Sequence, residues 1–325
     1  MNRDDPARAD SGDPRRYATE FHAPVLYKAV IEGLVTDRSG VYVDGTLGGG
    51  GHMAALLEAL DADALVVGID QDADALAEAQ VRLAKALGEG RVLLLHGNFG
   101  DAERLLKDTG ITEIDGMLLD LGISSHQIDV AERGFSYMAE GGLDMRMDRR
   151  SGLTADEIVN RWSPAELRRV LHDYGEEPRA GRIARAIVAA RPIASTAELA
   201  RLVRGQVRQQ DEVKTLSRVF QGLRIAVNGE LERLEQALAA GLHLIRPGGR
   251  MAVISYHSLE DRRVKRFFRY GNLEGEPVHD FYGNLLTPWR EVARKPVEPG
   301  EEEKRVNPRS RSARLRIAER LDFEQ

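Results

Sequence analysis

The chain has 325 residues, a formal net charge of −6 at pH 7 and no cysteine. The absence of cysteine excludes disulfides and cysteine-ligated zinc and suits a reducing compartment, so we expect a cytoplasmic protein. No apolar run approaches the roughly 18 residues of a transmembrane helix, and no membrane association is expected. The negative net charge does not by itself indicate a nucleic-acid-binding protein. A chain of this length holds one large domain or two.

The first 20 residues are polar and charged. They contain no apolar core of the kind found in signal peptides, so we expect residues 1–20 to form a disordered tail. An amphipathic helix is predicted next, over residues 27–34. His22, just before it, either contributes to a ligand site or only packs.

The first strand, turn and helix of the chain suggest a ligand site. Residues 41–44 form a short apolar run that ends in Asp44, and the glycines 48–51 separate it from a helical pattern over residues 53–60. Strand, glycine turn and helix open a nucleotide-sized site in α/β sheets, because glycine lacks a Cβ and the helix N-terminus offers free N–H groups. A plain tight turn without a ligand is the alternative.

The nature of the ligand depends on Asp44. No Lys-Ser or Lys-Thr follows the glycines, so a Walker A phosphate loop is not expected. Residues 49–54 fit G-x-G-x-x-A, which keeps a nicotinamide dinucleotide open. A carboxylate at the end of the first strand would repel a pyrophosphate, however, and it suits a cation. S-adenosylmethionine, with a sulfonium and an ammonium group, fits this position better.

Further buried strands are predicted over residues 64–70, 91–99 and 114–122, each separated from the next by a helix, and a fifth over 250–258. This alternation predicts an α/β fold with a doubly wound, mostly parallel sheet. Ligands bind at the carboxyl ends of such strands. Polar residues lie at four of these ends: Asp44, Asp70, Asn98 and Asp120.

Two of these strand ends carry specific expectations. Asp70 lies about 20 residues beyond the glycine turn, the distance at which an acid binds ribose hydroxyls. The alternative is that Asp70 only caps the next helix, which we expect over residues 75–87 after Asp72. Phe99 follows the third strand, where it either stacks on an adenine or packs in the core.

The second half of the chain departs from this pattern. A long loop over residues 122–148 is expected at the ligand-binding edge. Residues 154–210 are helical and rich in arginine, which indicates either a basic surface or ordinary solvated helix faces. One long helix is predicted over residues 218–244. The last strands are expected over residues 287–297 and 313–319, with an acidic turn at 301–303 between them.

We therefore predict a discontinuous main domain with an insertion. The main domain is expected over residues 21–137 and 213–325, and an inserted helical subdomain over residues 138–212.

Six motifs occur in order along the chain: His22-Ala-Pro-Val25, Asp44-Gly-Thr-Leu-Gly-Gly-Gly-Gly-His52, Asp120-Leu-Gly-Ile-Ser-Ser125, Leu143-Asp-Met-Arg-Met-Asp148, Ser255-Tyr-His-Ser-Leu-Glu-Asp261 and Asn307-Pro-Arg-Ser-Arg-Ser312. They closely resemble the motifs of the bacterial 16S ribosomal RNA cytosine-N4 methyltransferases of type H, the MraW family. The resemblance runs from about residue 21 to the C-terminus.

The resemblance implies a Rossmann-like class I methyltransferase that uses S-adenosylmethionine and carries a helical insertion for its RNA. The implied substrate is N4 of a cytosine in the decoding region of 16S ribosomal RNA. Two positions depart from the family pattern: His126 replaces an expected proline, which loosens the loop that holds Gln127, and Gly49 replaces a larger residue. The cofactor contacts implied by the resemblance are Gly50, Gly51, His52, Asp70, Phe99, Asp120 and Gln127.

The chemistry of the acceptor suggests further candidates. The lone pair of cytosine N4 is delocalised into the ring, so positioning of N4 should provide most of the rate. A carboxylate that accepts an N4–H bond would return the lone pair to nitrogen, and Asp120 and Asp144 are candidates. No metal is needed. The aromatic residues that either stack on a splayed base or pack are Phe135, Tyr137 and Tyr256, and His257 lies beside the last of them.

The expected partner is 16S ribosomal RNA, within the small ribosomal subunit, and a homodimer remains open. Two clusters of basic residues are predicted to include some phosphate contacts; the alternative is that they only pair with Glu260, Asp261 or residues 301–303. These clusters are Arg262, Arg263, Lys265, Arg266 and Arg269, and Arg309, Arg311, Arg314 and Arg316.

Three alternatives to this function are kept. A methyltransferase of the same fold acting on DNA or protein is weakened because the fourth strand ends in Asp-Leu-Gly-Ile-Ser-Ser, not in a Pro-Pro-Tyr motif. A nicotinamide-dependent oxidoreductase is disfavoured by Asp44. A non-enzymatic binding module is disfavoured by the polar strand ends.

Overall fold

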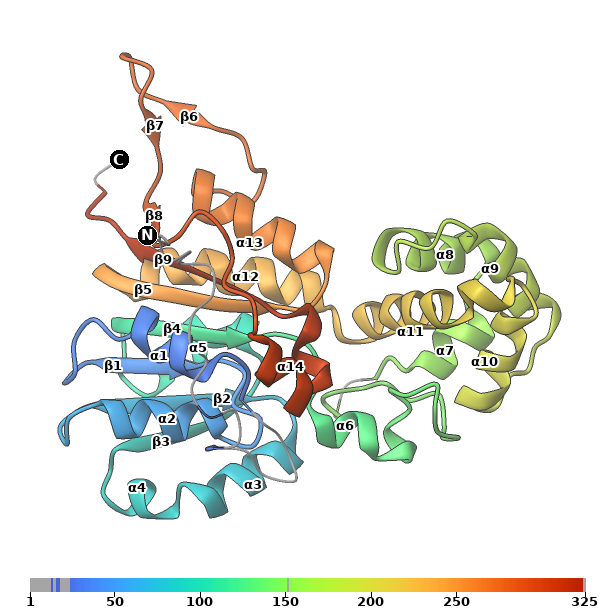
Figure 1. Ribbon diagram of the computed structural model, residues 1–325, viewed down its shortest axis with the longest axis horizontal. Coiled ribbons are helices and arrows are strands. Elements are labelled where there is room, and N and C mark those ends of the chain that lie inside the picture. The colour runs from blue at the N-terminus through green and yellow to red at the C-terminus, as the bar shows by residue number, and fades with distance from the viewer. Residues whose placement is uncertain (1–12, 14–15, 18–23, 151, 324–325) are drawn as a thin grey trace. The chain divides into compact units, whose positions relative to one another are not determined.

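The computed structural model describes residues 13, 16–17, 24–150 and 152–323 (Figure 1). Most of the predicted tail at 1–20, and His22, lie outside the described residues. Among the residues that are described, no helix combines the length and the apolar character of a membrane-spanning segment. The chain divides into two compact units: one holds the described residues up to Gly122 and from Glu232 onward, and the other holds Ile123–Leu231.

The first unit is built on a seven-stranded sheet in the order β3-β2-β1-β4-β5-β9-β8. The first five strands in this order are parallel, and β9 and β8 are antiparallel to their neighbours. The predicted doubly wound, mostly parallel sheet is confirmed. The strands are β1 (Val41–Asp44), β2 (Leu65–Asp70), β3 (Val92–His96), β4 (Ile114–Asp120), β5 (Ile245–Ser255), β8 (Trp289–Glu291) and β9 (Arg314–Arg320).

Helices cover both faces of this sheet, and successive residues of each strand pack on opposite faces. In β4, Leu118 packs against α1 (Tyr27–Leu34), α2 (Gly51–Ala59) and α3 (Ala73–Arg82). Its neighbours Met117 and Leu119 belong to the opposite cluster, with α5 (Ala102–Asp108), α12 (Glu230–Leu244) and α13 (Ser258–Tyr270). The predicted helix 75–87 is interrupted at Leu83, so α4 (Ala84–Gly88) follows α3.

The second unit is helical and has a hydrophobic core of its own. The predicted helical character of residues 154–210 is observed, and three of the helices are capped by Thr154, Ser163 and Ser195, each of which accepts a hydrogen bond from a backbone N–H in the following first turn. The α-helices are α6 (Ser125–Asp129), α7 (Ala155–Arg161), α8 (Pro164–Arg169), α9 (Ala180–Ala189), α10 (Thr196–Arg204) and α11 (Glu212–Asn228).

The bounds of this unit differ from the predicted insertion at 138–212. Phe135, before the predicted start, packs in the same core as Leu167 of α8. Val219 and Leu223 of α11, beyond the predicted end, also belong to that core. The unit therefore begins at Ile123, near the start of the predicted long loop, and it includes α11.

The predicted single helix over 218–244 is wrong. Gly229 has a φ of 60°, a left-handed conformation that ends α11, and its N–H bonds the carbonyl of Ile225. Glu230 then begins α12. Glycine reaches this conformation without the steric cost that other residues meet, so a single residue divides the two helices.

The C-terminal elements also differ from the prediction. The strand expected at 313–319 is confirmed as β9, but the strand expected at 287–297 is reduced to β8 and an isolated bridge between Val297 and Leu315. The acidic turn expected at 301–303 is wrong, because these residues begin the helix α14 (Glu301–Val306). Acidic side chains in a first turn suit the positive end of the helix dipole.

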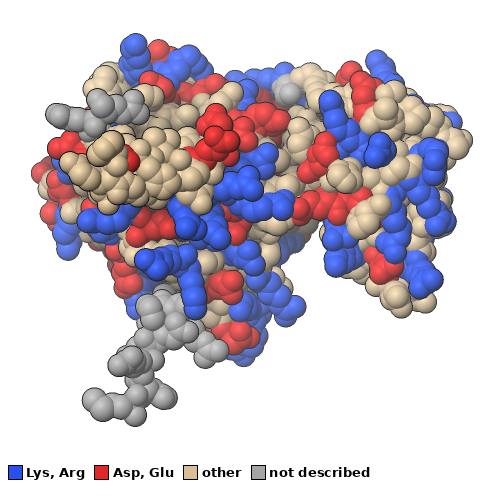
Figure 2. All heavy atoms as spheres, turned by 90° about the horizontal axis from the view of Figure 1, so that it is seen from above, with Lys and Arg blue, Asp and Glu red and all other residues tan. Residues whose placement is uncertain are grey.

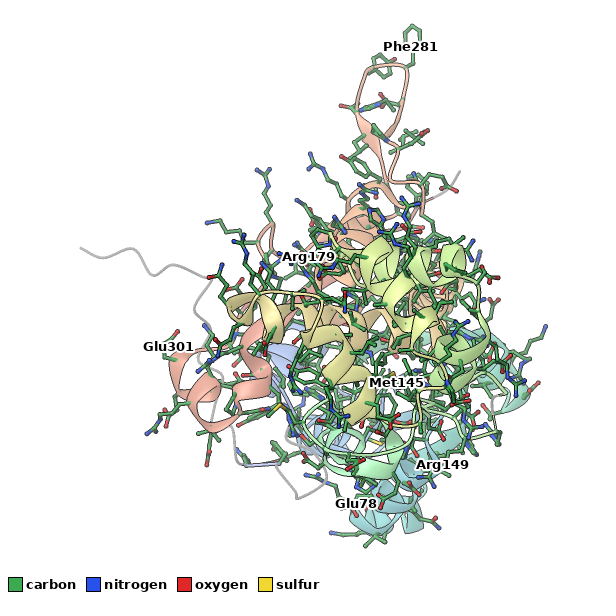
Figure 3. All side chains as sticks on the ribbon, turned by 90° about the vertical axis from the view of Figure 1, so that its right-hand side faces the viewer. Glu78, Met145, Arg149, Arg179, Phe281 and Glu301 are labelled. Carbon is green, nitrogen blue, oxygen red and sulfur yellow. The ribbon has the colours of Figure 1, made fainter. Side chains whose placement is uncertain are left out.

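A two-stranded hairpin extends from the first unit before β8. Its strands are β6 (Val278–His279) and β7 (Leu285–Leu286), and Phe281 lies at its outer end (Figure 3). On the face of the molecule shown in Figure 2, basic and acidic side chains are interspersed. The net charge of −6 therefore does not exclude local positive regions.

Glu303 of α14 ties the C-terminal part of the first unit to its first helix. Its Oε1 accepts a hydrogen bond from the backbone N–H of Leu26 at 2.7 Å, and the side chain is 2% exposed. Leu26 precedes α1 with a φ of 55°, and its own side chain provides no cap.

We predict that Glu303→Ala lowers the free energy of unfolding by about 1–3 kcal/mol, since it leaves the buried N–H of Leu26 without this acceptor. Urea denaturation measures the change. The neighbouring and exposed Glu302→Ala is the matched control, with an expected change within about 0.5 kcal/mol. Equal effects of the two substitutions would contradict a specific role for the contact with Leu26.

Candidate active site

Three carboxylates lie at the carboxyl ends of three adjacent parallel strands. Asp44 ends β1, Asp70 ends β2 and Asp120 ends β4, and β1 lies between the other two. The ends of parallel strands meet at one edge of a sheet, which is where ligands bind in open α/β folds. The structure therefore brings together the acids that the sequence placed at strand ends.

The loop after β1 is held by two of these acids and by β4. Thr46 donates its backbone N–H to Asp44 Oδ1 at 3.1 Å, and its hydroxyl oxygen accepts the backbone N–H of Asp120 at 2.6 Å. Gly48 donates its N–H to Asp70 Oδ2 at 2.8 Å. The conformation of the loop thus depends on the carboxylates beside it.

Glycine is required at particular positions of this loop. Gly48 and Gly50 have φ values of 50° and 74°, in the left-handed region. A Cβ on Gly51 would lie 2.9 Å from the Cδ of Pro24, which is too close, whereas a Cβ on Gly48 would find its nearest neighbour at 3.9 Å. The backbone at Gly48 is therefore bare, and Gly50 precedes the first turn of α2.

Asp44 is a buried acid with an unused oxygen. Its side chain is 1% exposed, and Oδ2 has no hydrogen-bond partner among the described residues. Burial raises the pKa of Asp44 to about 7, and the nearby charges of Asp120 and Asp70 act in the same direction against the hydrogen bond from Thr46. A buried oxygen of this kind suits a cationic donor such as the ammonium group of S-adenosylmethionine.

Asp70 is half-buried and accepts backbone hydrogen bonds on both carboxylate oxygens. Oδ1 accepts the N–H of Asp72 and Oδ2 accepts the N–H of Gly48, both at 2.8 Å. Burial raises the pKa of Asp70 to about 6, and these hydrogen bonds oppose the increase. Each carboxylate oxygen has a second lone pair, so a pair of ribose hydroxyls remains a suitable ligand. The helix cap is provided by Asp72, which accepts the N–H of Asp74.

Asp120 is part of a network that sequence analysis did not predict. The hydroxyl of Tyr256, after β5, donates to Asp120 Oδ1 at 2.8 Å, and Nδ1 of His52 lies 3.7 Å from Oδ2. Nε2 of His52 lies 2.9 Å from the carbonyl oxygen of Val25. Burial, followed by the charge of Asp120, raises the pKa of Tyr256 well above its usual value, so the hydroxyl keeps its proton.

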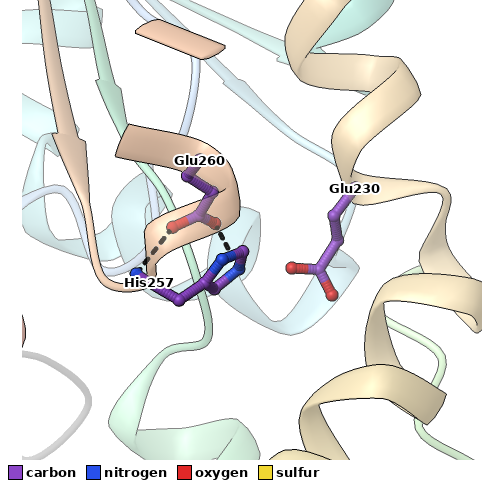
Figure 4. A group of neighbouring side chains, drawn as sticks. All are labelled: Glu230, His257 and Glu260. Carbon is purple, nitrogen blue, oxygen red and sulfur yellow. Dashed lines mark hydrogen bonds and ion pairs between the residues drawn. The ribbon is translucent and has the colours of Figure 1, made fainter. Parts of the chain in front are cut away.

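The ring of Tyr256 is partly buried, and the side chain of His257 is tied to the start of α13. Nε2 of His257 lies 3.1 Å from Glu260 Oε1 (Figure 4). Glu260 Oε2 accepts the backbone N–H groups of Tyr256 at 2.9 Å and His257 at 3.3 Å. Glu260 thus fixes the backbone that carries Tyr256, whereas a role for either residue in a base pocket stays a prediction.

Phe99 lies where β3 leads into a short 3₁₀ helix, Phe99–Asp101. It is partly buried and packs against the core on the α5 side of the sheet. Asn98 accepts the N–H of Gly100 at 2.8 Å and donates to Gln71 Oε1 at 2.7 Å. Core packing of Phe99 is therefore observed, and stacking on an adenine stays a prediction.

Two predicted site residues belong to the second unit. Gln127 is buried in α6, where its Oε1 accepts the N–H of Ser124 at 3.1 Å in a capping box. Asp144 receives Nε and Nη2 of Arg146 at 2.7 and 3.0 Å. Burial opposes ionisation of Asp144, but the hydrogen bonds from Arg146 outweigh it and lower the pKa. Asp144 is therefore an ionised acceptor, and the roles of both residues stay predictions.

Several basic residues predicted to contact phosphate are paired instead. Arg316 is 7% exposed, and its Nε lies 2.7 Å from Asp261 Oδ1. Arg314 lies 3.2 Å from the same carboxylate, and Nε of Arg263 lies 2.7 Å from Glu235. The alternative of pairing with Asp261 is observed for Arg314 and Arg316, and Arg263 pairs with an acid that was not predicted, Glu235. A phosphate contact by some of the other basic residues stays a prediction.

The pKa of Asp44 gives a prediction for the protein without a ligand. Because this pKa is about 7 in the folded protein and about 4 in an unfolded chain, the folded state binds more protons between these values. The contribution of Asp44 to stability therefore falls as pH rises from about 4 to about 7, with Asp70 acting in the same sense below about 6. We expect Asp44→Asn to reduce this fall, as measured by urea denaturation across the range.

The exposed Asp63→Asn is the control, and its stability profile should follow that of the parent protein. A profile for Asp44→Asn that coincides with the parent profile would show that Asp44 does not titrate in this window.

Known proteins resemble this chain over most of its length. A model of the MraW methylase family matches residues 19–321. The ribosomal RNA small subunit methyltransferase H of Chlorobaculum parvum is 49% identical over 324 residues, which cover 93% of this chain and 99% of that protein. The protein of the same name from Flavobacterium johnsoniae is 44% identical over 305 residues, with 93% and 98% covered.

The match covers both units, and the similarity extends over nearly the full length of the relatives. The predicted methyltransferase class, with S-adenosylmethionine as cofactor, is confirmed by these findings. The chain therefore belongs to the MraW methylase family.

Proposed function

We propose that this protein transfers a methyl group from S-adenosylmethionine to N4 of a cytosine in the decoding region of 16S ribosomal RNA. The observation that carries the proposal is the set of three acids at adjacent strand ends, beside a bare glycine loop, in a chain of the MraW methylase family. The names of the relatives support ribosomal RNA of the small subunit as the substrate. The position and atom of methylation rest on the resemblance of the motifs.

The first unit offers a ligand set that fits the cofactor. Asp44 Oδ2 is available to the ammonium group, and Asp70 to the ribose hydroxyls. Gly50 and Gly51 lead into α2 beside the bare backbone of Gly48, and we assign the adenine to Phe99. The cofactor supplies an electrophilic methyl group on a sulfonium. The nicotinamide alternative loses its basis, because a buried carboxylate beside the loop disfavours a pyrophosphate.

The site for the cytosine requires a group that accepts a hydrogen bond from the N4 amino group. Asp120 suits this role, because the hydroxyl of Tyr256 holds one of its oxygens and fixes its orientation. Tyr256 acts here as a positioning residue. Asp144 is the second candidate, but both of its oxygens are engaged by Arg146. Since N4 is a weak nucleophile, the orientation of these groups contributes more than their basicity.

The function is tested by incubating the purified protein with small ribosomal subunits and with protein-free 16S ribosomal RNA, each with methyl-labelled S-adenosylmethionine. Digestion and mass spectrometry of the nucleosides identify the product and its position. We expect N4-methylcytidine at one decoding-region position. A methyl group on carbon 5, on another nucleotide or on a ribosomal protein would refute the proposal.

Asp70 provides a test of the cofactor site. We predict that Asp70→Ala weakens binding of S-adenosylmethionine by about 1.5–3 kcal/mol, the scale of a hydrogen bond to a charged group. Isothermal titration calorimetry measures the change, with NAD as a second ligand that should not bind. Exposed Asp74→Ala on the same loop and helix is the matched control. Unchanged affinity in the Asp70 variant would remove this residue from the ribose site.

The pairing of the basic residues provides a test of the RNA surface. Lys265 and Arg269 are exposed one turn apart on α13, whereas Arg263 pairs with Glu235. We predict that Lys265→Ala with Arg269→Ala reduces the slope of log affinity against log salt by up to about one unit per lost phosphate contact. Arg263→Ala should leave this slope unchanged. The same slope in all three proteins would assign RNA binding to another surface, such as the arginines of the second unit.

A further inference from the structure

The hairpin β6–β7 presents two exposed aromatic side chains that the proposed chemistry does not use. Phe281 and Tyr282, between the two strands, are 97% and 85% exposed. Their rings lie edge to face with centroids 5.6 Å apart. Val278, Leu285 and Leu286 of the hairpin strands are also exposed. An exposed apolar patch of this kind commonly marks an interaction site.

The turn that carries these rings is fixed by its own hydrogen bonds. Asp280 accepts the backbone N–H groups of Tyr282 and Asn284 and the side-chain amide of Asn284, each at 2.8 Å. Gly283 completes the turn with a φ of 85° and donates its N–H to the carbonyl of Asp280. The aromatic pair is therefore preorganised, which lowers the entropic cost of docking it against a partner.

The base of the hairpin is anchored in the core of the first unit. Trp289, directly after the hairpin, is 2% exposed, and its ring centroid lies 6.2 Å from that of Phe267 and 5.7 Å from that of Phe268. The two arms meet where Gly271 contacts Pro288, so closely that a Cβ on Gly271 would collide with the proline ring. The hairpin thus has an ordered base and an ordered turn, and its outer end is uncovered.

The charge of the hairpin distinguishes between classes of partner. Between Gly271 and Trp289 the chain has three acids, Glu274, Glu276 and Asp280, and no lysine or arginine. Aromatic platforms that stack on nucleic-acid bases are combined with positive charge, which neutralises the phosphates. This segment has the opposite charge. A second copy of the same chain also has a net charge of −6, so its overall charge does not complement that of the hairpin.

We propose that the hairpin docks the enzyme onto a basic protein component of the small ribosomal subunit. In this interaction Phe281 and Tyr282 enter an apolar pocket rimmed by lysine or arginine, which face Glu274 and Glu276. Buried aromatic anchors inside a polar rim are the usual energetic centre of protein interfaces, and proteins that cover ribosomal RNA are generally basic. The inference rests on the proposed function, because that function places the substrate in a subunit.

The first experiment compares a double variant, which carries both Phe281→Ser and Tyr282→Ser, with the parent protein. Binding to purified small subunits and to protein-free 16S ribosomal RNA is measured by sedimentation or interferometry. We expect at least a roughly tenfold loss of affinity for subunits, the scale of losing interface anchors, and no loss for the free RNA. Val81→Ser, which removes another exposed apolar side chain from α3, is the matched control and should leave both affinities unchanged.

Correct folding of the variant is verified by unchanged binding of S-adenosylmethionine and an unchanged thermal transition. An equal loss of affinity for free RNA would show that the hairpin contacts RNA and would overturn the proposal. Unchanged affinity for subunits would overturn it as well. Because binding is the readout, a failure to methylate either substrate would count against the proposed function without deciding the docking.

A second experiment identifies the class of partner directly. A photoreactive phenylalanine analogue replaces Phe281, and the protein is irradiated with purified small subunits. The proposal predicts a cross-link to one ribosomal protein, which mass spectrometry identifies. An excess of the Phe281→Ser protein should not compete with this cross-link. A cross-link to ribosomal RNA, or to a second copy of this chain, would overturn it.

Discussion

The candidate site depends on burying acids side by side. Adjacent strands in a sheet lie about 4.8 Å apart, so acids at the ends of β2, β1 and β4 are close neighbours. Burial and mutual repulsion together raise the pKa of Asp44 to about 7. A cation beside Asp44 would replace lost solvation and oppose the repulsion. Binding of a cationic ligand there would therefore be coupled to ionisation of Asp44, and the residue that costs stability without a ligand would provide affinity for it.

The loop after β1 is part of this arrangement because its backbone N–H groups bind carboxylate oxygens of these acids. Thr46 and Gly48 donate their N–H groups to Asp44 and Asp70, and the hydroxyl of Thr46 accepts from the backbone of Asp120. The carboxylates thus orient the loop on one side and remain available on the other. A substitution of Asp70 removes its hydrogen bond to Gly48 as well as the proposed ligand contacts, which is why the affinity loss expected for it exceeds that of a solvent-exposed contact.

Local pattern and topology were enough to predict much of the fold. Buried apolar runs that alternate with helices specify a parallel sheet, and parallel strands bring Asp44, Asp70 and Asp120 to one edge without any knowledge of side-chain contacts. What sequence reasoning missed depends on contacts between distant segments. The hydroxyl of Tyr256 reaches Asp120 across 136 positions, and no periodicity reports such a pair. Gly229 also interrupts an amphipathic pattern that continues on both sides, so periodicity alone predicted one helix.

For the charged residues, too, the sequence pattern does not report contacts between distant segments. Alternation along β9 correctly places Leu315 in the core and Arg314 on an exposed surface, and it would place Arg316 with Arg314. Both arginines contact Asp261 in the first turn of α13, as alternation expects, but Arg316 is buried in its ion pair and only 7% exposed, which the pattern of β9 does not predict. Binding of a polyanion depends on cations that are not already neutralised by neighbouring acids. A count of arginines therefore gives only an upper limit to an RNA surface, and the pairing imposed by the fold decides which of them remain available.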